Sequence, residues 1–285
     1  MANQFGKHDS PRHKREPLSK GAPDNSNPAY QLAHRDLSFL ERDELRSLRF
    51  QLELLKPEML LDDAKIDSTF VIYGSARTSV TDPREAIESR RSHYEEARAL
   101  ARLASGVPLG GDGSRHFVVC SGGGPSIMEA ANRGAADVGR ESIGLNIVLP
   151  REQVPNEFVT PELSFQFHYF PLRKMHFILR AKAVAAFPGG FGTLDELFDI
   201  LTLMQTGKMP VVPVLLFDQD FWDKVIGFET LINAGMIERR DLELFRFVSS
   251  AEDAWEIVQR FYVEHPEPLW HRGAPAPPVD LQDEI

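Results

Sequence analysis

The central part of the chain alternates between short apolar runs and longer amphipathic segments. Seven apolar runs have the length of strands, and their sequences are STFVIYGSA, HFVVC, SIGLNIVL, FQFHYF, AVAAF, VVPVLLF and FRFV. In the segments between most of them, apolar residues recur at the three-to-four-residue spacing of a helix. Strands that are apolar on both faces and alternate with amphipathic helices indicate an α/β fold, with a parallel sheet covered by helices on both faces.

Several helix boundaries can be predicted from capping residues. Ser38 and Glu41 have the spacing of a capping box, and the leucines that follow share one face of a helix. These leucines are Leu45, Leu48, Leu52 and Leu55. Asp82 before Pro83 predicts the start of a long helix that runs to residue 105. Further helices are expected over residues 126–139, 173–182, 193–207 and 251–265, with one or two more before Ile237.

Composition divides the chain into four segments. Residues 1–35 are polar, with six Lys or Arg against three Asp or Glu, and they are predicted to form a disordered basic arm. Residues 36–65 are expected to form an N-terminal helical extension, and residues 66–263 a single α/β domain. Residues 264–285 are predicted to be a proline-rich C-terminal tail.

The overall composition limits the classes of function. The 285 residues carry a net charge of -10 and include 42% hydrophobic residues, which is typical of a globular protein. No apolar run has the length of a membrane helix, and the N-terminal sequence lacks the apolar core of a secretory signal. Cys120 is the only cysteine, which excludes an internal disulfide, so we expect a cytoplasmic protein. The acidic balance argues against a nucleic-acid partner, and no feature indicates a membrane partner.

Three predicted strands end in turns of small residues. These turns are Gly74–Ser75, Ser121–Gly124 and Gly189–Gly192. Because the carboxyl ends of parallel strands share one edge of the sheet, the turns should lie together there. Glycine lets the backbone approach a ligand, and the helices that follow offer free N–H groups. Three such turns favour a site for a phosphate or a polyhydroxylated ligand over purely structural turns.

Most common phosphate-binding and catalytic motifs are absent. Gly190-Phe191-Gly192 is followed by Thr193, Leu194 and Asp195, so it does not complete the dinucleotide fingerprint G-x-G-x-x-G. The chain also lacks the Walker pattern, H-E-x-x-H and G-x-S-x-G. No His, Cys and acidic residues have metal-ligand spacing, so neither a metal nor a cofactor is expected.

Glu196 and Arg173 are the candidate catalytic residues. Thr193 and Glu196 have the spacing of a capping box, so Glu196 could simply bond back to the helix start. Alternatively, its carboxylate could stabilise a sugar carbon that becomes cationic when an N-glycosidic bond breaks. Arg173 follows the run FQFHYF and should reach the same sheet edge, where its planar guanidinium could hold the ligand. The alternative for Arg173 is a solvated surface position.

Taken together, four segments resemble the LONELY GUY (LOG) family, whose members are often labelled lysine decarboxylases. The segments are VIYGSA, SGGGPSIMEAANRGA, the Arg173-Lys174 pair and PGGFGTLDE, and the resemblance covers residues 66–217. The family implies a Rossmann-like doubly wound fold, so the domain at 66–263 is expected to be a nucleotide-binding catalytic domain. It also implies a homodimer that hydrolyses cytokinin riboside 5′-monophosphates, AMP or related nucleotides to free base and ribose 5-phosphate.

The resemblance also implies roles for individual residues. Glu196 matches the catalytic acid of the family, and Arg173 matches its catalytic arginine. The other matching positions are implied to bind the substrate and its phosphate, and they are Ser75, Gly122, Gly123, Gly124, Gly189, Gly190, Gly192 and Thr193.

The chain resembles the longer bacterial members of the family, to which NEFVTPELSFQFHYFPLRK is closer, and it departs from the short plant-type members in three further places. Its first 65 residues have no counterpart there, Glu129 replaces a usual glycine, and LGGDGSR at 109–115 resembles a lengthened loop. These departures leave the preferred base open.

Two other functions remain as alternatives. A nucleotide-binding carrier or sensor without catalysis would use the same glycine turns but has little use for a carboxylate beside a phosphate. A pyridoxal-phosphate decarboxylase would need a Schiff-base lysine, for which Lys174 and Lys182 are the nearby candidates.

Overall fold

The computed structural model describes residues 28–77, 87–148 and 154–265. The predicted cap at Asp82 and Pro83, most of the basic arm and almost all of the C-terminal tail lie outside these residues. The chain forms two compact units, residues 1–49 and residues 50–285. The domain boundaries expected at residues 35, 65 and 263 stay predictions.

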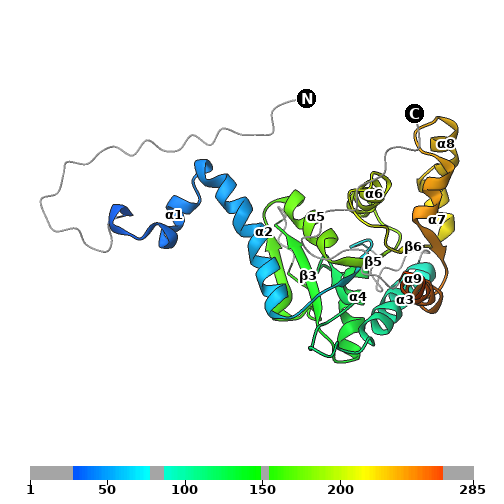
Figure 1. Cartoon of the computed structure of the whole chain (residues 1–285), viewed down its shortest axis with the longest axis horizontal. Helices are drawn as coiled ribbons and strands as arrows, with labels where there is room; N and C mark the ends of the chain where they lie inside the picture. The colour runs from blue at the N-terminus through cyan, green and yellow to red at the C-terminus, as the bar shows by residue number, and fades with distance from the viewer. Residues whose placement is uncertain (1–27, 78–86, 149–153, 266–285) are drawn as a thin grey trace, which may run out of the picture. The chain divides into compact units, whose positions relative to one another are not determined.

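The second unit is built around a seven-stranded, entirely parallel sheet (Figure 1). Its strands are β1 (Thr69–Tyr73), β2 (Val118–Ser121), β3 (Ser142–Ile147), β4 (Ser164–Phe167), β5 (Ala181–Ala186), β6 (Val214–Phe217) and β7 (Arg246–Val248). Their order across the sheet is β4-β3-β2-β1-β5-β6-β7, so the direction of winding reverses between β1 and β5. The predicted doubly wound α/β fold of the Rossmann-like type is confirmed.

Helices pack on both faces of this sheet. In chain order they are α2 (Arg46–Asp63), α3 (Ile87–Ser105), α4 (Ile127–Asp137), α5 (Phe170–Leu179), α6 (Phe191–Gln205), α7 (Gln219–Val225), α8 (Phe228–Asn233) and α9 (Ala251–Glu264). Side chains of α3, α4 and α9 form one buried cluster with alternate strand residues such as Phe70 and Ile72. Side chains of α2, α5, α6, α7 and α8 form the other cluster, with Val71 and Tyr73. Neighbouring residues of β1 therefore face opposite layers, which explains its uninterrupted apolar sequence.

The first helical segment is capped by a different residue from the one predicted. A short helix, α1 (Leu37–Leu40), is capped by Asp36, whose side chain accepts from Phe39 N at 3.0 Å, and Ser38 instead donates to Asp36 at 2.6 Å. The expected capping box of Ser38 and Glu41 is therefore wrong. Asp36 is a stronger cap here because its carboxylate reaches both the amide and the hydroxyl.

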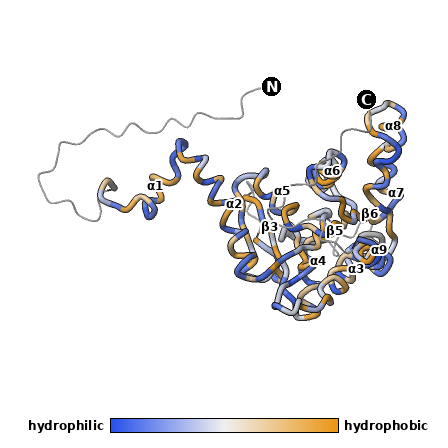
Figure 2. The backbone as a smooth tube through the Cα atoms, in the orientation of Figure 1, coloured by the Kyte–Doolittle hydropathy of each residue, from blue (hydrophilic) through white to orange (hydrophobic). Residues whose placement is uncertain are grey.

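The apolar face predicted for α2 is also wrong. Leu45 precedes the helix, and Leu48, Leu52 and Leu55 are 39%, 51% and 53% exposed. Within the second unit, α2 buries Pro57 and Leu61 instead, on a different side of the helix. Figure 2 shows hydrophobic and hydrophilic residues alternating along this helix.

Other boundaries moved by a few residues. The helix expected at 173–182 is α5, which begins at Phe170 because Pro171 favours a helix start, and it ends before β5. Among the described residues, no helix combines the length and the apolar character needed to cross a bilayer.

Candidate active site

The turns after β1 and β5 meet at the point where the strand order reverses. Phe187 N donates to Tyr73 O at 2.9 Å, and Ser75 N donates to Pro188 O at 3.2 Å, so the two strands stay paired beyond their ends. In doubly wound sheets this reversal point opens a crevice in which ligands bind. The structure therefore brings the first and third predicted turns together.

Buried polar side chains hold the turn Gly122–Gly124, which follows β2. Ser121 Oγ accepts from Gly123 N at 3.0 Å and donates to Asn132 Oδ1 at 2.8 Å. Asn156 Nδ2 donates to Asn132 Oδ1 at 2.9 Å and to the carbonyl of the last glycine of the turn at 3.0 Å. Gly123 has a φ of +70°, a conformation that favours glycine. The second turn is thus held in one geometry.

The third turn leads directly into α6. This helix starts at Phe191, and its N-cap residue Gly190 provides no side-chain hydrogen bond. A Cβ atom at Gly190 or Gly192 would meet nothing within 4 Å, whereas one at Gly189 would overlap Thr193. The helix start is therefore open on the side of Gly190 and Gly192. Free backbone N–H groups at such a helix start attract anions.

Arg173 and Glu196 form a largely buried ion pair. Arg173 Nη2 lies 3.3 Å from Glu196 Oε1, and the two side chains are only 12% and 13% exposed. Arg173 Nε donates to Leu145 O at 2.8 Å, and the guanidinium carbon lies 5.1 Å from the centre of the Phe177 ring. Its Nη2 also lies beside Gly122, where a Cβ atom would come within 2.8 Å of it. Arg173 therefore links β3 and the second turn to the first turns of α6.

The environment of Glu196 favours its protonated form. Burial raises the pKa of this carboxyl to about 7, and the nearby Arg173 lowers it less than burial raises it. Asp195 and Asp199 raise the pKa slightly further, and Lys174 lowers it. Both protonation states are therefore populated near neutral pH, as in many groups that transfer protons.

The alternative in which Glu196 acts as a helix cap is not what the structure shows. The helix begins two residues before Thr193, so Thr193 lies inside the first turn and Glu196 pairs with Arg173. Its neighbour Asp195, expected as a solvated acid, pairs with Lys174 at 2.9 Å.

Lys174 has the environment of a lysine in a salt bridge and not that of a Schiff-base lysine. It lies 2.9 Å from Asp195 and 2.7 Å from Asp199. Burial lowers the pKa of Lys174, but the two carboxylates outweigh burial and raise it overall. An amine that attacks a carbonyl needs a lowered pKa. Burial does lower the pKa of Lys182, but this residue lies at the amino end of β5, opposite the glycine turns.

Two further titratable groups lie beneath the site. Burial raises the pKa of the Cys120 thiol and of the Tyr73 phenol, and the negative charge of Glu196 adds to both shifts. Both groups are protonated at neutral pH, so neither provides a ready nucleophile. Within residues 28–77, 87–148 and 154–265, no three His, Cys, Asp or Glu side chains are grouped as metal ligands would be.

The sequence did not predict two residues that shape the site. Asn132 lies at 0% exposure in α4 and Asn156 lies in the loop before β4. A polar residue inside the apolar stripe AANRGAA was the available signal for Asn132, because a buried amide needs partners. Asn156 gave no comparable signal, since its partners are distant in sequence.

The chain is similar to known proteins over part of its length. A family model described as possible lysine decarboxylase matches residues 128–258. The cytokinin riboside 5′-monophosphate phosphoribohydrolase LOG of Oryza sativa subsp. japonica is 32% identical over 156 residues, which are 53% of this chain and 61% of that protein. LOG3 of Arabidopsis thaliana, which has the same enzyme name, is 27% identical over 178 residues, 61% of this chain and 76% of that protein.

Among solved structures, the molybdenum cofactor binding protein of the phototrophic bacterium Rippkaea orientalis is 20% identical, with a TM-score of 0.45. That comparison covers 69% of this chain and 96% of the other. The match to the rice protein spans 61% of its length, so the activity of the whole relative does not transfer directly. The family model and the two plant relatives agree with the resemblance to the LOG family expected from the sequence segments.

Proposed function

We propose that the protein hydrolyses the N-glycosidic bond of a purine nucleoside 5′-monophosphate and releases the free base and ribose 5-phosphate. The observation that carries this proposal is the buried pair of Arg173 and Glu196, 3.3 Å apart, beside the open start of α6. The plant relatives are phosphoribohydrolases by name, which supports the same reaction class for this chain.

The proposed phosphate site is the third glycine turn. Backbone N–H groups of Gly190, Gly192 and Thr193 would bind the phosphate oxygens, helped by the partial positive charge of the helix start. The base would lie toward Gly122–Gly124, and Ser75 would line the crevice from the β1 side. A phosphate at the helix start would place the ribose toward Glu196, which is one turn further along α6.

The proposed chemistry uses one acid and one cation. As the bond between the anomeric carbon and the base nitrogen breaks, its electron pair goes to the base, and positive charge develops on the ribose. The Glu196 carboxylate would stabilise that charge and accept a proton from the water that adds to the anomeric carbon. The departing base takes up a proton, which closes the balance of the hydrolysis. Arg173 would orient the ribose or phosphate oxygens and hold Glu196 in place.

This role gives the reaction a defined pH dependence. The ionised carboxylate is the active form, and the pKa of Glu196 is about 7. We therefore expect the rate of base release to rise with pH and to level off above neutrality, with a midpoint near that pKa.

The test is a product assay. The purified protein is incubated with AMP and, separately, with isopentenyladenosine 5′-monophosphate, and the free base is followed by chromatography. Adenosine, which lacks the phosphate, is the matched control substrate. We expect base release from a monophosphate, little release from adenosine, and a loss of at least about a hundredfold in Glu196→Gln.

Two results would contradict the proposal. Equal rates for wild type and Glu196→Gln would remove the carboxyl from the mechanism. Tight AMP binding by calorimetry without release of base would instead favour a nucleotide-binding module. The same assay ranks adenine against isopentenyladenine as the base.

The family also supports two finer proposals. We propose a homodimer, which sedimentation equilibrium of the intact chain would test. We propose a cytoplasmic location, in keeping with a lone buried thiol at Cys120.

A further inference from the structure

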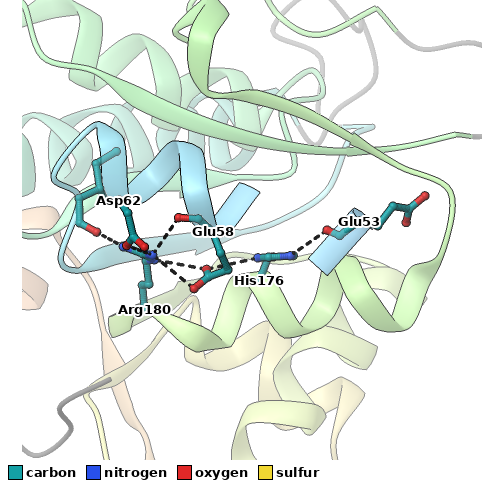
Figure 3. Close-up of polar contacts among 6 residues, drawn as sticks. Glu53, Glu58, Asp62, His176 and Arg180 are labelled. Atoms are coloured by element: carbon teal, nitrogen blue, oxygen red, sulfur yellow. Dashed lines mark hydrogen bonds and ion pairs between the residues drawn. The ribbon is translucent and has the colours of Figure 1, made fainter. Parts of the chain in front are cut away.

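Helix α2 lies outside the residues that the family model matches, yet it contacts α5 inside them. The matched region begins at residue 128, and α2 ends at Asp63. Figure 3 shows side chains of α2 and α5 that point toward one another. The contacts lie at three places, which are the start of α5, its last turn and the residue that follows it.

At the start of α5, Glu53 supplies a cap from another helix. Its Oε1 accepts from His168 N at 3.0 Å, and its Oε2 accepts from Tyr169 N at 3.2 Å. Tyr169 is the N-cap residue of α5 and gives no side-chain cap hydrogen bond of its own. A carboxylate at a helix start satisfies N–H groups and complements the positive end of the helix dipole.

In the last turn of α5, His176 is buried and also contacts α2. Its Nε2 donates to Glu53 O at 3.2 Å, and its Nδ1 lies 3.6 Å from Glu58 Oε1. His176 therefore fixes α5 to the backbone of the same residue whose carboxylate caps the helix.

At the end of α5, Arg180 joins the helix to two carboxylates of α2. Its Nη2 lies 2.7 Å from Asp62 Oδ1 and 3.3 Å from Glu58 Oε2, and its Nη1 donates to Ile66 O. The Arg180 side chain is 7% exposed, so its charge depends on these partners. Together with the Glu53 cap, α2 holds both ends of α5.

Arg173 lies between these two attachment points. Its own amide donates to Tyr169 O at 3.2 Å, so it belongs to the turn that Glu53 caps, and His176 follows three residues later. The Arg173 side chain extends to Leu145 O and to Glu196 on other elements. Because a helix moves as a rigid unit, a shift of α5 would change the distance between Arg173 and Glu196.

We propose that α2 is a positioning element for the reaction, in which Glu53 and His176 hold α5 so that Arg173 lies against Glu196. The inference rests on the proposed hydrolase function for its kinetic consequences. A displacement of about 1 Å can reduce a catalytic rate roughly a hundredfold, so such a clamp has functional weight.

The experiment compares three substitutions in α2. Glu53→Ala removes the cap on α5, Glu53→Gln keeps its shape and one acceptor, and Lys56→Ala is the control on the exposed side of the same helix. We expect kcat for base release from AMP to fall roughly tenfold to hundredfold in Glu53→Ala, with a smaller change in KM. Glu53→Gln should lie between that variant and wild type, and Lys56→Ala should match wild type.

The pH profile separates positioning from simple loss of folded protein. Arg173 lowers the pKa of Glu196, so its withdrawal should move the midpoint of the rate profile above that of wild type. A loss of kcat that only follows the folded fraction, with an unmoved midpoint, would overturn the proposal. If Glu53→Ala does not fold, Glu53→Gln gives the same comparison.

A spectroscopic readout keeps this test independent of activity. The ¹⁵Nε–H resonance of Arg173, assigned by its loss in Arg173→Lys, reports the hydrogen bond to Leu145 O. It should move in Glu53→Ala and stay in place in Lys56→Ala. If wild type releases no base, the proposed function fails while this readout still decides the clamp. An unmoved resonance in Glu53→Ala would overturn it.

Discussion

At the residue scale, the candidate site contains the Glu196 carboxyl, whose burial lowers the stability of the folded protein when the group is ionised. Glu196 is mostly buried, and its ion pair with Arg173 does not fully offset the loss of water. A carboxyl with a pKa raised by burial is less stable when ionised in the folded protein than in the unfolded chain. Stability lost in this way is common where a side chain serves a reaction.

The first prediction concerns the stability of Glu196→Gln. The pKa of Glu196 is about 7 in the folded protein and 4.5 for the ordinary group. Below the lower value both states bind the proton, so wild type has no penalty there. As pH rises from the lower to the higher value, wild type loses about 3 kcal/mol, and the neutral glutamine loses nothing. Chemical denaturation of both proteins at pH 4.5 and pH 8 measures this difference.

We expect the free energy of unfolding of Glu196→Gln, relative to that of wild type, to rise by about 3 kcal/mol across that interval. The difference in free energy of unfolding between the two proteins at low pH reports the altered contact with Arg173. It is the reference against which the difference at high pH is compared. A stability difference that does not change with pH would show that Glu196 has an ordinary pKa.

The second prediction concerns the third glycine turn. Alanine at Gly189 would overlap Thr193, so Gly189→Ala should destabilise the protein by about 1–3 kcal/mol. Alanine at Gly192 meets nothing within 4 Å and lies inside α6, so Gly192→Ala should keep or slightly raise stability. Its methyl group would nevertheless obstruct the proposed phosphate site, and AMP affinity should fall at least about tenfold.

Calorimetric titration of AMP in a Glu196→Gln background, where turnover is prevented, measures the affinity, and thermal melts measure the stability. Unchanged affinity in a folded Gly192→Ala would place the phosphate elsewhere.

At the element scale, close packing of α3 and α4 depends on small residues, and Gly134 is one of them. A Cβ atom at Gly134 of α4 would overlap the backbone carbonyl of Arg98 in α3. This glycine sits inside a helix, where alanine normally has the higher helix propensity. Packing therefore outweighs propensity at this position.

The third prediction follows from that contact. Gly134→Ala should destabilise the protein by about 1–3 kcal/mol, because the backbone of α3 must move away from α4. Gly139→Ala is not a matched control because its φ is +67°, so Ala136→Gly at the exposed side of α4 serves instead. That change should cost about 1 kcal/mol through helix propensity alone. Urea denaturation measures both changes, and a neutral Gly134→Ala would mean that the helices separate freely.

Helix types and order were predictable from sequence, whereas several ends and faces were not. The helix after Gly190 was evident from the period of Leu194, Leu197 and Leu201, a local property. The start of α5 at Phe170 was missed because the apolar run FQFHYF suits a strand equally well. The buried side of α2 was missed because the partners of this helix lie more than a hundred residues away along the chain, as in the contacts of Glu53 with His168 and His176.

At the scale of the whole molecule, the strand order of the parallel sheet brings distant segments of the chain together at the candidate site. The glycine turns follow β1, β2 and β5, which are neighbours in the sheet although β5 is fourth after β1 along the chain. That reversal brings Glu196 beside Arg173, which the sequence placed only at the same edge. The network of Asn132 and Asn156 could not be predicted, because it joins α4 to a loop whose path depends on the completed sheet.

The fourth prediction compares two truncations of the N-terminal region. Residues 29–35 are all exposed, so deletion of residues 1–35 should leave the melting temperature nearly unchanged. Deletion of residues 1–63 removes Glu53, Glu58 and Asp62, and it leaves the buried Arg180 without its carboxylates. The same deletion removes the buried side chain of Leu61, and loss of a buried leucine costs about 2–5 kcal/mol, which lowers the melting temperature of a domain of this size by roughly 4–20 °C. Calorimetry of both truncated proteins measures this difference, and equal melting temperatures would mean that α5 holds its place without α2.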